Sequence, residues 1–184
     1  MTEFETYLKK AGDYHGHICA GIVFGTRISL AAIKALGLDP AAKNKNLIVY
    51  TEIDRCMTDA VQVVSGCHLG HRSMKYVDYG KFAATFVNTD TGKAVRGTIK
   101  ESFKSGNDVD ELIKTVAQLP EEAVVTLQEV KVVIPEVDLP GMPQRTAKCS
   151  VCGERIMDGR EVSRDGEVYC RACSGGKYYQ QVEH

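Results

Sequence analysis

Residues 149–152 read Cys-Ser-Val-Cys, and residues 170–173 read Cys-Arg-Ala-Cys. Seventeen residues separate the two pairs, a spacing typical of zinc sites built from paired cysteines. The two-residue gap within each pair lets a tight turn direct both thiolates at one ion, about 2.3 Å away, and two such turns complete a tetrahedron. We therefore predict a structural zinc site with four ligands, Cys149, Cys152, Cys170 and Cys173.

The segment that carries these cysteines, residues 148–184, is too short to build an ordinary hydrophobic core. Structural zinc contributes on the order of 10 to 16 kcal/mol in finger peptides, so the metal can take the place of a core. Turn signals at Asp158-Gly159 and Asp165-Gly166 predict a short hairpin over residues 155–169. Because four thiolates fill the shell of the zinc ion, this site leaves no position for a substrate.

Composition places the 184-residue chain among soluble globular proteins, with 43% hydrophobic and 26% charged residues. The net charge of −1 indicates no basic face for nucleic acid. The first 40 residues lack the pattern of a signal peptide, and Arg27 and Lys34 interrupt the apolar stretch 18–38. We therefore expect a cytoplasmic protein without membrane contact. Seven cysteines without an export signal favour metal ligands or reactive thiols over disulfides.

Three prolines between residues 135 and 143 predict an extended linker, because proline removes an amide donor and disfavours helix before it. We expect an N-terminal domain at 1–134, a proline-rich linker at 135–147 and a zinc finger at 148–184. Hydrophobic periodicity predicts the N-terminal elements. The expected helices are 4–12, 23–36, 58–64 and 108–119, the last capped by Asn107 or Asp108, and the expected strands are Leu47–Thr51, 82–88, Ala94–Ile99 and 127–134. A turn at 88–92 joins two of these strands, so the order predicts an α+β domain whose mixed sheet is flanked by helices.

A second candidate site lies near the N-terminus, where His15, His17 and Cys19 occupy alternate positions. In an extended segment alternate side chains share a face, so these groups could point at one metal ion. Gly16 and Gly21 would allow a turn and a close backbone approach. Cys19 would then lie at the start of the next helix, where the helix dipole favours thiolate.

Another group of chemically active residues follows between positions 54 and 71. A helix that begins near Cys56 would place Cys56 and Asp59 on one face. Cys67 would follow the far end of this helix, where Gly66 is the expected stop. A single free cysteine is commonly a buried apolar residue, so both interpretations of Cys67 stay open. The two histidines that follow, His68 and His71, are expected at the surface.

Four runs of sequence resemble motifs of FmdE, a family named after formylmethanofuran dehydrogenase. The runs are His-Gly-His-Ile-Cys-Ala-Gly at 15–21, Cys-Met-Thr-Asp-Ala-Val-Gln at 56–62, Gly-Cys-His-Leu-Gly at 66–70 and Asp-Tyr-Gly-Lys at 78–81. The resemblance covers nearly the whole chain and implies a thioredoxin-like α+β domain with a Cys/His cleft, followed by a treble-clef-like zinc finger. It implies an N-terminal metal site drawn from His17, Cys19, Cys56 and Cys67, with Asp59 close by. His68 stands where members often have threonine.

The same resemblance suggests an accessory protein or subunit related to the molybdenum enzyme that reduces CO₂ onto methanofuran in anaerobic metabolism. We expect a divalent ion in the N-terminal site, zinc by preference, because mixed thiolate and imidazole ligands suit it. Two alternatives stay open: a thiol redox enzyme or sensor in which Cys19 and Cys56 are the catalytic residues, and a regulator that docks through its finger. We also expect a homodimer, or a complex with a molybdoenzyme. Turnover itself stays undecided at this point.

Overall fold

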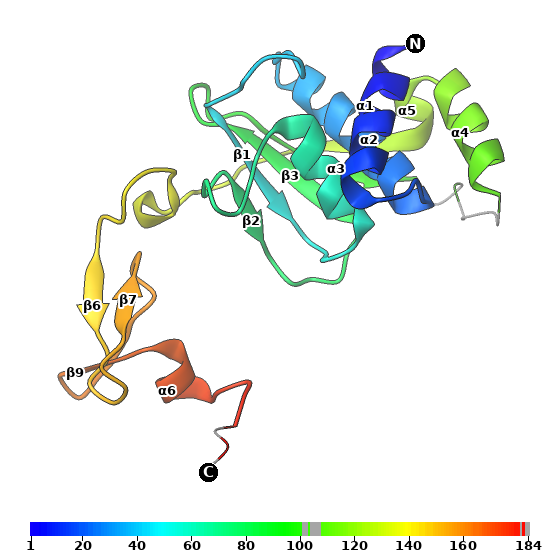
Figure 1. Ribbon diagram of the computed structural model, residues 1–184. Coiled ribbons are helices and arrows are strands. Elements are labelled where there is room, and N and C mark those ends of the chain that lie inside the picture. The colour runs from blue at the N-terminus through cyan, green and yellow to red at the C-terminus, as the bar shows by residue number, and fades with distance from the viewer. Residues whose placement is uncertain (101–102, 104–107, 181, 183–184) are drawn as a thin grey trace. The chain divides into compact units, whose positions relative to one another are not determined.

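The computed structural model describes residues 1–100, 103, 108–180 and 182. The chain divides into two compact units, Met1–Val133 and Ile134–His184 (Figure 1). The boundary between them lies one residue before the one predicted from the prolines.

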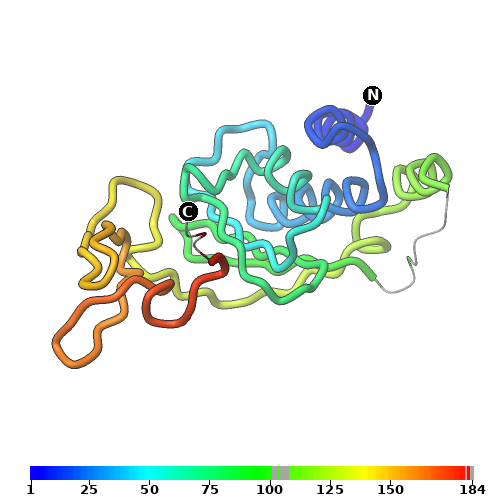
Figure 2. Tube along the Cα trace, turned by 60° about the horizontal axis from the view of Figure 1, so that its bottom comes forward, coloured from blue at the N-terminus to red at the C-terminus, as the bar shows by residue number. Residues whose placement is uncertain are grey.

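Three helices of unit 1 lie together over one face of its sheet (Figures 1 and 2). Helix α1, Glu3–His15, starts with a capping box in which the Thr2 side chain accepts from the Glu5 amide while the Glu5 carboxylate accepts from the Thr2 amide. Its predicted end was three residues too early, because the helix continues to His15 and stops at Gly16, whose φ is 96°. The segment around His15 is therefore helical, where an extended conformation was predicted.

Helix α2, Ala20–Ala35, is the central helix of unit 1, since every residue from Ile22 to Ile33 is buried. Helix α3, Cys56–Ser65, crosses it closely and ends at Gly66, the predicted stop. A Cβ atom at Gly25 would stand 2.8 Å from the Cβ of Ala60, so the two backbones approach nearer than larger side chains would permit. This close crossing brings the first turns of α2 and α3 together.

The sheet of unit 1 has five strands in the order β2-β1-β3-β4-β5. Strand β1 pairs in parallel with β2, and the remaining neighbours pair antiparallel. The strands are β1 Leu47–Thr51, β2 Met74–Tyr76, β3 Ala83–Asn88, β4 Ala94–Ile99 and β5 Val125–Val130. The predicted α+β architecture, a mixed sheet flanked by helices, is confirmed. Strand β2 was not predicted, and β5 begins and ends earlier than the expected 127–134.

Helix α4, Val109–Gln118, starts at Asp108, whose carboxylate accepts from the amides of Asp110 and Glu111. The other proposed cap, Asn107, lies outside the described residues. The guanidinium of Arg27 is buried under the Phe4 ring and donates to the carbonyls of Val116 and Leu119, at the end of α4. A short helix, α5 Glu121–Val124, then leads into β5. In the part of the chain described here, no helix has the length and apolarity needed to cross a membrane.

Unit 2 is built from short elements around the cysteine pairs. They are the 3-10 helix η1 Glu136–Asp138, strands β6 Thr146–Lys148, β7 Arg155–Met157, β8 Val162–Arg164 and β9 Glu167–Tyr169, and helix α6 Arg171–Gly175. Strand β7 pairs with β6, and β8 pairs with β9. The prediction of a single hairpin over 155–169 is therefore wrong. Strand β7 pairs with β6, which precedes the first cysteine pair, and only β8 and β9 form a hairpin within the predicted range.

The proline-rich segment predicted as a linker packs within unit 2. The carboxylate of Asp138 in η1 accepts from the Arg160 guanidinium, and Arg145 forms an ion pair with Glu161. Val137 lies against Gly159 at the turn after β7. Ion pairs and apolar contact thus attach residues 137–145 to the hairpins of the finger.

Candidate metal sites

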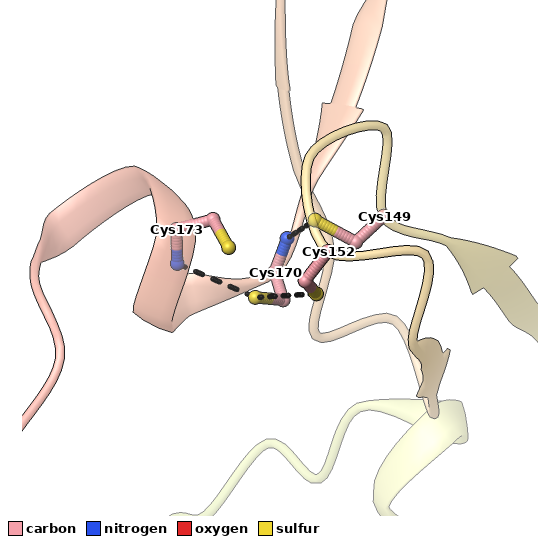
Figure 3. Close-up of side chains that lie close together, drawn as sticks. All are labelled: Cys149, Cys152, Cys170 and Cys173. Atoms are coloured by element: carbon pink, nitrogen blue, oxygen red, sulfur yellow. Dashed lines mark hydrogen bonds between the residues drawn. The ribbon is translucent and has the colours of Figure 1, made fainter. Parts of the chain in front are cut away.

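The four cysteines of unit 2 converge on one point (Figure 3). Their sulfur atoms all lie within 4.8 Å of one another, as one tetrahedral ion requires. The Cys170 amide donates to Cys149 Sγ and the Cys173 amide donates to Cys170 Sγ, each over 3.3 Å. Backbone amides that point at sulfur stabilise thiolate, so the turns also prepare the ligands for a cation.

Electrostatics within this cluster favour a bound cation. Backbone hydrogen bonds, first that of the Cys152 amide, lower the pKa of Cys149 to about 6. Hydrogen bonding with Cys170 raises the pKa of Cys173 to about 12. Four thiols this close cannot all ionise against one another, whereas a divalent cation at their centre removes that repulsion. The residues present therefore fit zinc.

In unit 1, His15, His17 and Cys19 form a second cluster of side chains that could hold a metal ion. One ligand atom from each lies within 4.8 Å of the other two, and the rings of His15 and His17 are 4.8 Å apart. His15 is the last residue of α1, and Cys19 is the N-cap of α2, so the turn between the helices brings the groups together. His17 is exposed, which opens the cluster to solvent on one side.

Asp59 reaches this cluster from the first turn of α3. Its Oδ2 atom lies 2.7 Å from Nδ1 of His15. Among the described residues, Asp59 does not belong to the mutual group of ligand atoms formed by His15, His17 and Cys19. The carboxylate thus touches one imidazole.

Cys56, the first residue of α3, lies beside Cys19. Burial, followed by hydrogen bonding with Cys19, raises the pKa of the Cys56 thiol. A Cβ atom at Gly21 would stand 2.9 Å from the Cβ of Cys56 and 3.6 Å from Sγ of Cys19. Gly21 was predicted to permit a close approach, and its neighbour is the Cys56 side chain. Gly25 lies four residues further along the same face of α2 and also permits the close approach of α3. This role was not predicted from the sequence, although the four-residue spacing of Gly21 and Gly25 indicated it.

Cys67 does not join this cluster. It is buried at the far end of α3, about 15 Å from Cys56 along a ten-residue helix, and its Sγ donates to the Leu47 carbonyl. Burial raises the pKa of this thiol. The ligand role implied by the family resemblance is corrected here, because the helix length keeps Cys67 away from Cys19.

His68 and His71 follow Cys67 and stay at that end of α3. Their rings contact each other at 5.1 Å, with His68 half-buried and His71 exposed. Within the described residues, neither joins a group of three or more metal-ligating side chains.

Comparison with known proteins identifies both parts of the chain. Residues 14–135 match the family model described as "FmdE, Molybdenum formylmethanofuran dehydrogenase operon". The chain belongs to the FmdE family. Residues 144–179 of this FmdE-family protein match the prokaryotic dksA/traR C4-type zinc finger, which together with the cysteine cluster confirms a C-terminal zinc site.

Two relatives extend the comparison. A curated protein from Archaeoglobus fulgidus, named "Probable S-adenosyl-L-methionine-binding protein", is 31% identical over 93% of this chain, which spans only 53% of that relative. The crystal structure of a tungsten formylmethanofuran dehydrogenase FmdE-like protein from Syntrophus aciditrophicus has a TM-score of 0.63 and 23% identity. The structural match covers 96% of this chain and 95% of the Syntrophus chain, so the two proteins share a fold.

Proposed function

We propose that this FmdE-family protein is a metal-binding accessory protein with two metal sites, a structural zinc in the finger and a divalent ion in unit 1. The observation that carries the proposal is the cluster of His15, His17 and Cys19, whose ligand atoms lie within 4.8 Å of one another. Cys56 stands next to Cys19 and offers a fourth donor. Mixed imidazole and thiolate ligands suit zinc, and they also accept iron or nickel.

Several features support a site that handles metal or substrate over a purely structural one. His17 is exposed, so the first cluster is accessible from solvent, whereas the finger has four thiolates and a closed shell. With His15, His17 and Cys19 as its three ligands, the site keeps a fourth coordination position that water, substrate or the Cys56 thiolate can occupy. The description of the family refers to the molybdenum formylmethanofuran dehydrogenase operon, and we propose a supporting role in that one-carbon chemistry.

Elemental analysis of protein purified without oxygen tests the two-site proposal. We expect two divalent ions per wild-type chain and one in the double variant Cys19→Ala, Cys56→Ala. Cys67→Ala is the matched control, because this cysteine lies outside the cluster and its loss should leave both ions bound. Wild-type metal content in the double variant would refute the proposal.

A second candidate function is thiol redox chemistry, which the contact between Cys19 and Cys56 favours. In that reaction the two thiols lose two protons and two electrons to form one disulfide, and a small-molecule disulfide accepts them as two thiols. Protein that keeps zinc in the finger but has none in unit 1 would then lose two hydrogens in mass on treatment with such a disulfide and resist alkylation at Cys19 and Cys56. Independent alkylation of the two cysteines would rule this function out.

Assembly and location extend the same proposal. We propose a homodimer that can associate with a molybdoenzyme complex in the cytoplasm. Light scattering at the mass of one chain would contradict the dimer. Co-purification with a molybdenum or tungsten enzyme from cell extract, lost when unit 2 is removed, is the expected result for the complex.

A further inference from the structure

The contact between His15 and Asp59 joins two parts of the chain that are 44 residues apart. His15 ends α1, and Asp59 lies in the first turn of α3. The 2.7 Å separation between Nδ1 and Oδ2 is that of a charge-assisted hydrogen bond. The His15 side chain is 17% exposed and that of Asp59 is 40% exposed, so the bond lies at the edge of the cluster.

This bond selects one tautomer of His15. A carboxylate can only accept hydrogen bonds, so the proton of the neutral imidazole must stand on Nδ1. The lone pair then stands on Nε2, the atom left to bind a metal ion. Carboxylates that hold a histidine in this way raise its basicity and set its ring orientation.

We propose that Asp59 is a positioning residue, which orients His15 for the divalent ion of unit 1 and is not itself a ligand. The proposal rests on the metal site proposed above. Among the described residues, the cluster of ligand atoms within 4.8 Å of one another contains His15, His17 and Cys19 and does not include the Asp59 carboxylate.

A purely structural role for Asp59, as a tie between α1 and α3, can be separated from positioning. One turn further along α3, the Gln62 amide donates to the Tyr14 hydroxyl over 2.5 Å and ties the same two helices. Removing the Gln62 amide therefore breaks a neighbouring tie, a hydrogen bond to which neither His15 nor Asp59 contributes. It serves as the control for a structural role, and Asp13→Asn, at an exposed residue paired with Lys9, serves as the control for charge.

The experiment uses the full chain with its finger already filled by one equivalent of zinc, and then titrates Co²⁺ as the probe of the second site. Asp59→Ala should weaken Co²⁺ binding about 10- to 100-fold with unchanged stoichiometry. Asp59→Asn, whose amide oxygen still accepts from Nδ1–H, should lose less. Gln62→Ala and Asp13→Asn should bind as the wild type does.

Nitrogen NMR of the His15 ring in protein whose second site is empty supplies a readout independent of metal. We expect the Nδ1–H tautomer in the wild type and in Gln62→Ala, and a shift toward Nε2–H in Asp59→Ala. The inference is overturned if the tautomer does not change, if Gln62→Ala weakens Co²⁺ as much as Asp59→Ala, or if the cobalt absorption of Asp59→Ala shows a lost ligand. A wild type that takes up no Co²⁺ overturns the proposed function instead, while the tautomer measurement still decides whether Asp59 orients the ring.

Discussion

Removing one zinc ligand should unfold unit 2 and leave unit 1 intact. Cys170→Ser breaks the tetrahedron, because the serine hydroxyl is a poor zinc ligand beside three thiolates. Among its described residues, the buried hydrophobic side chains of unit 2 are those of Cys149 and Ile156. Burial of one isoleucine contributes about 1.5 to 3 kcal/mol. Ordering each backbone residue costs about 1 to 2 kcal/mol, so without zinc the finger has no comparable source of stability.

The size of the effect follows from this comparison. Structural zinc contributes on the order of 10 to 16 kcal/mol in finger peptides, several times what the Ile156 side chain can supply. We therefore expect unit 2 of Cys170→Ser to unfold completely. The effect should be much larger than a small fall in melting temperature. In hydrogen exchange, amides such as that of Cys149, which donates to the Glu154 carbonyl, should lose their protection.

The assay combines zinc stoichiometry with limited proteolysis and mass spectrometry. Cys170→Ser should lose one zinc per chain and be cleaved within 134–184, while fragments of Met1–Val133 persist. Cys56→Ser is the matched control, because it makes the same replacement in unit 1 and should leave the finger protected. Unchanged zinc content and unchanged resistance of unit 2 in Cys170→Ser would refute the reasoning.

Three further predictions concern unit 1. Gly25→Ala places a Cβ 2.8 Å from the Cβ of Ala60 and should lower the free energy of unfolding by about 1 to 3 kcal/mol; an unchanged denaturant midpoint would contradict this. Arg96 donates to both carboxylate oxygens of Glu52, and this hydrogen bonding lowers the pKa of Glu52 below its ordinary 4.5. The ion pair therefore stabilises the fold above about pH 4.5, and this stabilisation is lost as the pH falls through the lowered pKa. Glu52→Gln should therefore lower the melting temperature at neutral pH and flatten its decline in acid; parallel curves for variant and wild type would count against the pair. Arg27→Leu leaves the carbonyls of Val116 and Leu119 without their donor and should lower the free energy of unfolding by about 1 to 3 kcal/mol. Amides of α4 should then exchange faster, and unaltered exchange there would show that these hydrogen bonds are dispensable.

Local patterns predicted most of the secondary structure. Strands β1 and β4 have the predicted bounds, because their β-branched runs are flanked by turn residues. Helix α3 begins at Cys56 and stops at Gly66, where a glycine in the left-handed region ends it. The missed strand β2 has three residues and pairs only at the sheet edge, so its own composition carries little signal.

The N-terminal cluster shows where local patterns fail. Cys67 follows Cys56 closely in sequence, yet the rigid rise of α3 separates them. His15 lies at the end of a helix, so its proximity to Cys19 comes from the turn at Gly16 and not from an extended strand. The hydrogen bond from His15 to Asp59 spans 44 residues and depends on how α1 packs against α3.

The sequence by itself determined the zinc finger, because both cysteine pairs are local motifs and their ligand geometry follows from two tight turns. It also determined the α+β class, since helix and strand periodicities are properties of short segments. Only the tertiary structure decided which residues gather at the proposed second site. Its members come from the end of α1, the turn between α1 and α2, and the start of α3. Their approach depends on contacts such as that of Gly21 with Cys56, and such packing is set by the whole core and not by any one segment.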